Sequence, residues 1–144
     1  MRRFALVVVV LLGCGPVPED APTLGMLVPA LAHDPFHAGD HWRGTYTCPQ
    51  GSTALDLVIV SVDGSDITDA LFDYDWNGVT GSFHLSGTFD AESGHATFLD
   101  GAWISRPSSE WYSVGLDGTA TESSYAGLIV GKGCGSFSLT RIRS

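Results

Sequence analysis

The feature that most constrains the fold is a series of short β-type segments that fills the chain from Trp42 onward. Within residues 67–75 the side chains at 70, 72 and 74 are apolar and those at 69, 73 and 75 are acidic, and this period of two predicts a strand with one buried and one solvated face. The predicted buried side chains there are Ala70, Phe72 and Tyr74. Turn residues separate the segments, so eight strands are predicted, at residues 42–48, 55–63, 67–75, 81–90, 96–99, 111–116, 125–130 and 134–142.

No helical segment separates these strands. The sheet is therefore predicted to be antiparallel, because parallel strands need long crossover connections that are usually helices. Eight strands within about 100 residues predict an all-β fold, a single antiparallel eight-stranded meander barrel, with a β-sandwich as the alternative.

The start of the chain has the pattern of an export signal. Two arginines precede an unbroken apolar run from Phe4 to Leu12, and these nine residues are too few for a membrane-spanning helix, which needs roughly 20.

The sequence Leu11-Leu12-Gly13-Cys14 resembles the lipobox of bacterial lipoproteins. The resemblance implies cleavage before Cys14 and acylation of Cys14, which would anchor the exported protein stably to a membrane. Because Gly15 stands where an aspartate would retain a lipoprotein at the inner membrane, it also implies the outer membrane. An ordinary secretory signal with a chance cysteine is the alternative.

Residues 14–40 are predicted to form a disordered tether, because prolines interrupt every potential helix or strand, at Pro16, Pro18, Pro22, Pro29 and Pro35. The expected organisation is a signal peptide at 1–13, an acylated cysteine with a proline-rich tether at 14–40, and a β-barrel domain at 41–144.

The two remaining cysteines, Cys48 and Cys134, are predicted to form a disulfide, the usual state of an even pair in an exported protein. It would close a loop of 86 residues and stabilise the fold by about 4 kcal/mol. Cys48 ends the first strand and Cys134 begins the last, so antiparallel pairing of these strands would bring the two together and close a barrel. With the first strand at Trp42-Arg43-Gly44-Thr45-Tyr46, the chain resembles the avidin and lipocalin barrels in topology, a likeness that carries no functional residues.

The composition is acidic. Without residues 1–13 the chain keeps five basic and sixteen acidic residues, a net charge of −11 with neutral histidines. A surface of this sign disfavours nucleic acid and anionic lipid head groups.

Two patterns are candidates for metal binding. Asp73, Asp75 and Asn77 match the start of a calcium loop, but His84 stands where its bidentate glutamate should be, and a hairpin turn is the favoured interpretation. His33, His37 and His41 are spaced by four, but Pro35 and Gly39 interrupt the helix that would align them, and a polar linker is favoured. No metal or other cofactor is predicted.

Aromatic residues frame the longest predicted loop, which runs from Trp103 to Trp111 and contains Arg106. Trp103, Arg106 and Trp111 would suit a ligand site at a barrel mouth, since such sites combine aromatic walls with a few polar groups. The alternative is that the tryptophans belong to the core and plug the barrel.

Catalysis has less support, because no nucleophile motif is present and only His84 and His95, with Asp90 or Asp100, offer a candidate acid–base pair.

The sequence supports three hypotheses about function. The first is a non-catalytic envelope lipoprotein whose barrel binds a small ligand, a glycan or another envelope protein. The second is an envelope hydrolase or metal-dependent enzyme that uses His84 and His95, and the third is a purely structural envelope component.

Overall fold

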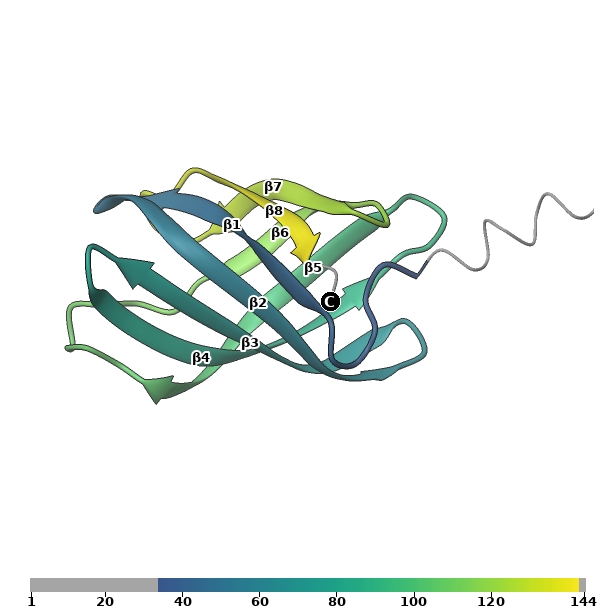
Figure 1. The fold of residues 1–144 in the computed structure, drawn as a ribbon, viewed down its shortest axis with the longest axis horizontal. Helices are drawn as coiled ribbons and strands as arrows, with labels where there is room; N and C mark the ends of the chain where they lie inside the picture. Colours follow the sequence, from purple (N-terminus) through teal and green to yellow (C-terminus); the bar gives the residue numbers. More distant parts are fainter. Residues whose placement is uncertain (1–33, 143–144) are drawn as a thin grey trace, which may run out of the picture. The chain divides into compact units, whose positions relative to one another are not determined.

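The predicted all-β fold is confirmed by the structure, a computed structural model that describes residues 34–142. Eight strands pair antiparallel, each with its neighbour in sequence, and β1 also pairs with β8, so that the sheet closes into a barrel (Figure 1). The strands are β1 His41–Cys48, β2 Gly51–Asp63, β3 Asp66–Trp76, β4 Val79–Phe89, β5 His95–Ser105, β6 Gly115–Ala120, β7 Ser124–Val130 and β8 Ser136–Ile142.

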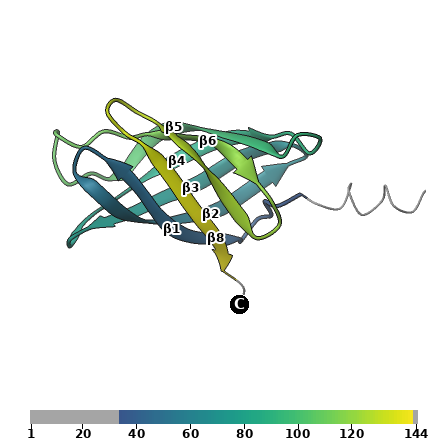
Figure 2. The ribbon, with the colours of Figure 1, turned by 90° about the horizontal axis from the view of Figure 1, so that it is seen from above.

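Closure depends on the pairing of the first and last strands, which lie side by side in Figure 2. In this register Trp42 is opposite Arg141, and Tyr46 is opposite Phe137. Gly44 allows the two strands to approach closely, since a Cβ at this position would lie 1.9 Å from the Ser138 carbonyl oxygen. Closure gives every strand two partners, so the sheet has no edge strand, which is the hazard that barrels avoid.

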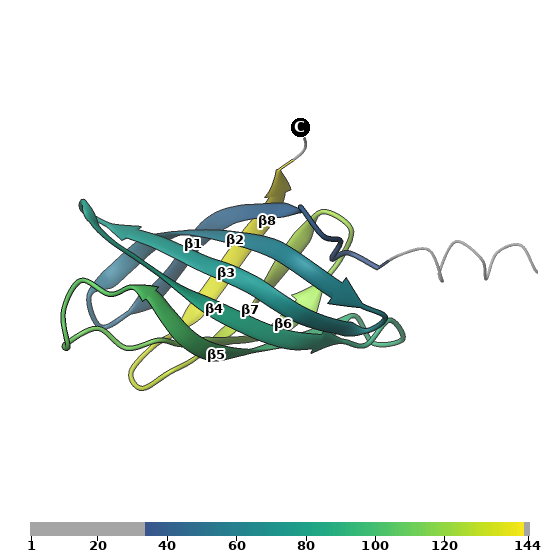
Figure 3. The same ribbon diagram turned by 90° about the horizontal axis from the view of Figure 1, so that it is seen from below.

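The largest departure from the predicted strand boundaries concerns β5 and β6. The fifth strand, predicted at 96–99, extends from His95 to Ser105, and the sixth, predicted at 111–116, begins at Gly115. Beyond Phe98 the strand β5 pairs only with β4, where a β-bulge shifts the register, and it leaves the side of β6 (Figure 3). Residues 99–102 are all exposed, so the period of two that marks a strand is lost there.

The barrel has two different ends. The end at which β1 begins and β8 finishes is called the closed end here, because Phe36 is fully buried there. Its ring packs against Trp42, Phe98 and Tyr125 at centroid distances of 5.3–5.6 Å. The opposite end, where β1 finishes and β8 begins, is called the mouth. Between the two ends the interior is filled by side chains, the largest fully buried ones including Trp42, Tyr125, Phe72, Phe83 and Phe98.

Residues 34–40 correct the expected domain boundary, since the sequence analysis assigned them to the tether. The compact unit begins at Asp34. The Gly39 amide donates to the Ile59 carbonyl oxygen and the Ile59 amide donates to the Asp40 carbonyl oxygen, at 2.7 and 2.9 Å, so the end of this segment is attached to β2. Arg141 also donates a hydrogen bond of 2.7 Å to the Pro35 carbonyl oxygen. The segment is a loop, as proline and glycine indicate, but tertiary contacts bury Pro35 and Phe36 within it.

The signal, Cys14, tether residues 14–33 and His33 lie outside the described residues. Within residues 34–142 no helix has the length and apolar character needed to cross a membrane.

Candidate ligand pocket at the barrel mouth

Four connections lie at the mouth, and the β3–β4 turn is one of them. The other three surround a pocket: the β1–β2 turn, the β5–β6 loop at residues 106–114 and the β7–β8 turn at residues 131–135. Between them lies a hollow of about 320 Å³, which we call the mouth pocket. This volume is at the lower end of the range of small-molecule sites, roughly 300–1,000 Å³. The pocket is lined by Tyr46, Cys48, Pro49, Gln50, Glu110, Trp111, Tyr112, Ser113, Val114, Gly131, Lys132 and Cys134.

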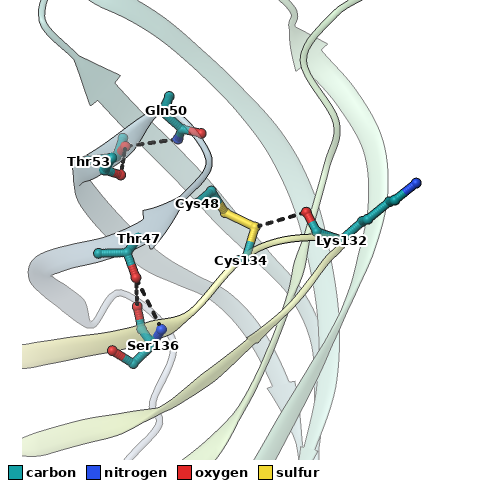
Figure 4. Close-up of a disulfide and its surroundings, with 8 residues drawn as sticks. Thr47, Cys48, Gln50, Thr53, Lys132, Cys134 and Ser136 are labelled. Atoms are coloured by element: carbon teal, nitrogen blue, oxygen red, sulfur yellow. Dashed lines mark hydrogen bonds between the residues drawn. A yellow bond between two sulfur atoms is a disulfide. The ribbon is translucent and has the colours of Figure 1, made fainter.

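The predicted disulfide between Cys48 and Cys134 is confirmed, and it ties the β1–β2 turn to the β7–β8 turn (Figure 4). Hydrogen bonds beside it strengthen the same junction. The Thr47 hydroxyl accepts from the Ser136 amide at 3.2 Å, and the Thr47 carbonyl oxygen accepts from the Gly135 amide at 2.9 Å. Two of the three connections around the pocket are therefore held in place covalently.

Arg106 fixes the third connection. Its Nε and Nη2 atoms both donate to the Trp111 carbonyl oxygen, at 3.0 and 2.7 Å, and its guanidinium lies 5.3 Å from the Trp103 ring centroid. The Trp111 ring stacks on Tyr74 with centroids 5.0 Å apart. Trp111 is therefore held on both its backbone and its ring, although it lies in a loop.

The three residues predicted to bind a ligand thus differ in their position relative to the mouth pocket. Trp111 lines the mouth pocket and also packs against the core. Trp103 lies within β5 and packs against Phe83 at a centroid distance of 5.0 Å, as the core alternative expects. Arg106 is not among the lining residues and acts on the pocket through Trp111.

The inner part of the pocket is polar but uncharged. Tyr46 is only 4 % exposed, and burial raises the pKa of its phenol well above the ordinary value, an effect that hydrogen bonds to Gln50 and Thr53 oppose. Gln50 donates to the Thr53 hydroxyl at 2.9 Å, and Thr53 is itself buried. At neutral pH none of these three side chains carries a charge, and Tyr46 and Gln50, which line the pocket, have groups that can donate or accept hydrogen bonds.

Charged groups occur only at the exposed rim of the pocket, where Glu110 and Lys132 lie. Neither side chain forms an ion pair with another residue of the 34–142 range. Lys132 extends away from the disulfide in Figure 4.

The candidate catalytic histidines do not meet in a site. His84 pairs with Asp69 at 2.9 Å and His95 pairs with Asp117 at 2.7 Å, rather than with Asp90 or Asp100. The two pairs lie on different strands, and all four side chains are at least one-third exposed. Neither histidine lines the mouth pocket. This geometry does not bring a buried carboxylate, a histidine and a nucleophile together, as acid–base catalysis in a pocket requires.

The candidate metal ligands of the described residues lie in two separate places, the β3–β4 hairpin and the segment that leads into β1. Asn77 and Gly78 adopt φ angles of 50° and 90° and form the tight β3–β4 turn, in which the Gly78 amide donates to the Asp75 carboxylate at 2.8 Å. His37 contacts Arg141, and His41 lies on the exposed face of β1. Within residues 34–142 no group of three histidine, cysteine, aspartate or glutamate side chains is placed to hold a metal ion.

A larger hollow of about 460 Å³ lies on the barrel wall, mostly against outward-facing residues of β1 to β5, and it is more open to solvent than the mouth pocket. Arg43 and Asp56 line it and form an ion pair of 2.7 Å. Burial, and then the neighbouring Asp56 charge, raise the pKa of Asp73 above its ordinary value. The groove therefore has acidic walls, and Tyr74 is the one aromatic residue among those that line it, whereas Tyr46, Trp111 and Tyr112 line the mouth pocket.

No protein-family model, curated protein or solved structure matches this chain. The candidate site therefore depends on its own geometry. Sequence reasoning missed Tyr46, Gln50 and Tyr112, although the predicted disulfide was a signal for Gln50, which follows Cys48 by two positions. Tyr112 adjoins Trp111, but the register that turns both side chains toward one hollow could not be derived from the pattern.

Proposed function

We propose that this protein is a lipid-anchored, non-catalytic binding protein of the bacterial cell envelope, in which the barrel mouth takes a small ligand. The resemblance of residues 11–14 to a lipobox supports the anchor, and Gly15 after it favours the outer membrane. The observation that carries the binding proposal is the mouth pocket itself, a hollow with aromatic walls and a neutral polar interior at one end of a barrel that is otherwise filled.

Rigidity of the pocket supports binding over a purely structural role. Ligand sites are usually preformed, since ordering a mobile site would reduce affinity. The Cys48–Cys134 disulfide and the Arg106–Trp111 hydrogen bonds fix the three connections around the pocket. A purely structural component does not need a fixed, open and aromatic-lined mouth.

The test is an NMR titration of the full mature lipoprotein in a detergent without a sugar head group. The probes are neutral methyl glycosides, a small aromatic alcohol and a short uncharged peptide. If the proposal is correct, at least one probe class shifts the Trp111 indole and Gln50 side-chain amide signals, and the Leu128 signals stay unchanged. Leu128 is the control because it is 65 % exposed and lies outside the mouth pocket. If no probe shifts the pocket signals, the structural hypothesis replaces the binding hypothesis.

A further inference from the structure

We propose that the mouth pocket takes a single neutral, hydroxylated ring, of the kind that a terminal monosaccharide of a glycan presents. The inference rests on the proposed function and specifies its ligand class. Three properties of the pocket carry it: a fixed aromatic platform, an uncharged polar interior and a size that admits one ring.

The platform is Trp111, which lines the pocket and is partly exposed. Tyr74 stacks on the indole at an interplanar angle of 22°, which supports the ring from one face. The neighbouring Tyr112 lines the same pocket and is 77 % exposed. Rigid aromatic side chains of this kind supply contact area at low cost in conformational entropy. The C–H face of a pyranose is a suitable partner, because it is flat, apolar and polarised toward an aromatic ring.

The interior excludes a charged group. Tyr46 and Gln50 line the pocket, and Thr53 lies behind Gln50 as its hydrogen-bond partner. An ionised ligand group placed against these side chains would lose its hydration without gaining a counter-charge, which is strongly unfavourable. A hydroxyl or amide group would exchange hydrogen bonds with Tyr46 and Gln50 instead.

The rim adds an acceptor suited to hydroxyl groups. Glu110 lines the pocket and has no ion-pair partner among residues 34–142. A carboxylate accepts hydrogen bonds through two oxygens, so it can bind a pair of adjacent ring hydroxyls. The acidic surface of the protein at the same time disfavours anionic ligands.

The size and position of the pocket limit the ligand to an end group. The volume of about 320 Å³ is at the lower limit for small-molecule sites, and Phe36 and the filled barrel interior prevent a chain from threading through. A ring at the end of a glycan fits this geometry, whereas an internal ring of a long polymer would require an open groove.

The test titrates the full mature lipoprotein, in the same detergent, with the methyl glycosides of glucose, galactose and N-acetylglucosamine. The matched probes are glucuronate and glucosamine, which add one charge to the same ring, and benzyl alcohol, which keeps an apolar ring and a single hydroxyl. At least one neutral glycoside should bind at the Trp111 and Gln50 signals, about tenfold more tightly than its charged counterpart and than benzyl alcohol.

Trp111→Ala and Glu110→Gln should each weaken glycoside binding by about tenfold, and Leu128→Ala should leave it unchanged. Retention of the Cys48–Cys134 disulfide and of a dispersed NMR spectrum checks that each variant is folded. If benzyl alcohol or a charged sugar binds in the pocket and no neutral glycoside does, the ligand class is wrong and the proposed function stands. If nothing binds in the pocket, both are wrong.

Discussion

The guanidinium of Arg141 lies over the indole of Trp42, 5.5 Å from the ring centroid, at the closed end of the barrel. The two residues are opposite each other in the β1–β8 pairing. Arg141 also donates hydrogen bonds to the Pro35 carbonyl oxygen and to the Asp40 carboxylate. The Arg141 side chain thus links the β1–β8 pairing, which closes the barrel, to residues 35–40, which precede β1.

Replacement of Arg141 by leucine is therefore expected to lower the free energy of unfolding by about 2 kcal/mol, because it removes charged hydrogen bonds to the partly buried Asp40 carboxylate and to the Pro35 carbonyl oxygen. Denaturant unfolding measures the loss. Arg43→Leu is the matched control, since Arg43 and Asp56 form an exposed pair, 60 % and 37 % accessible, whose loss should cost less than about 1 kcal/mol. Equal losses in the two variants would contradict the assigned role of Arg141.

Phe36→Ala tests whether the folded unit begins before β1. Phe36 is fully buried among Trp42, Phe98 and Tyr125, so its truncation is expected to cost about 3–5 kcal/mol through lost burial and a new cavity. Tyr112→Ala, which removes an aromatic ring that is 77 % exposed, should change stability by less than about 0.5 kcal/mol. If Phe36→Ala unfolds at the same denaturant concentration as the wild type, residues 34–40 belong to the tether after all.

Phe36 also shows which parts of the fold the sequence pattern could predict. Alternation in 67–75 correctly predicted that Ala70, Phe72 and Tyr74 face the interior, because burial of one sheet face imposes a period of two. The position of two cysteines correctly predicted that the first and last strands pair. Both predictions depend on local periodicity or on a covalent bond.

What the pattern missed depends on contacts between distant segments. Pro35 and Gly39 are typical of a loop, and only the contact with the barrel buries Phe36 between them. The second half of β5 pairs only with β4, and its side chains do not alternate between buried and exposed. The residue at which β5 ends could therefore not be predicted. The mouth pocket joins three connections that are far apart in the chain, and its lining depends on register, which composition and spacing do not define.

Loss of the disulfide should loosen the mouth and destabilise the whole barrel. The double variant Cys48→Ser and Cys134→Ser is expected to lose about 2–5 kcal/mol, since the bond closes a loop of 86 residues and lies between two connections that line the pocket. Urea unfolding of the double variant and the wild type measures the difference. Denatured, unreduced wild type should show no thiol from Cys48 or Cys134, and quantitative labelling of either would contradict the bond.

Alkaline pH should destabilise the barrel through its buried tyrosines. Burial raises the pKa of Tyr74 to about 12, and it raises the pKa of Tyr46 and Tyr125 still further. Between pH 10 and 12 the unfolded chain releases the Tyr74 proton, since the ordinary pKa is about 10, whereas the folded chain keeps it. The unfolded state then binds fewer protons, so the unfolding free energy falls as pH rises, by at most about 1.4 kcal/mol per pH unit for each such tyrosine.

Tyr74→Phe tests the contribution of one phenol to this decline. The fall between pH 10 and 12 should become shallower, and stability at neutral pH should not decrease, because the buried Tyr74 hydroxyl has no hydrogen-bond partner among residues 34–142. Tyr125→Phe is the contrasting variant. Its hydroxyl donates to the Ala96 carbonyl oxygen at 2.9 Å, so its removal should cost about 1 kcal/mol at neutral pH. An unchanged pH slope for Tyr74→Phe would show that this phenol does not contribute.

The proposed anchor depends on one atom, the Cys14 sulfur, which lies outside the described residues. If Cys14 is acylated as the lipobox implies, Cys14→Ser removes the acceptor of the lipid, and a chain without several acyl groups has only marginal membrane affinity. The variant should therefore move from the membrane fraction to the soluble periplasmic fraction. Cys134→Ser is the matched control, because it removes a cysteine of the barrel and should leave the protein membrane-bound. Mass spectrometry of the wild-type amino terminus gives the independent measurement, and an unmodified terminus, or membrane fractionation of Cys14→Ser identical to the wild type, would exclude the lipid anchor.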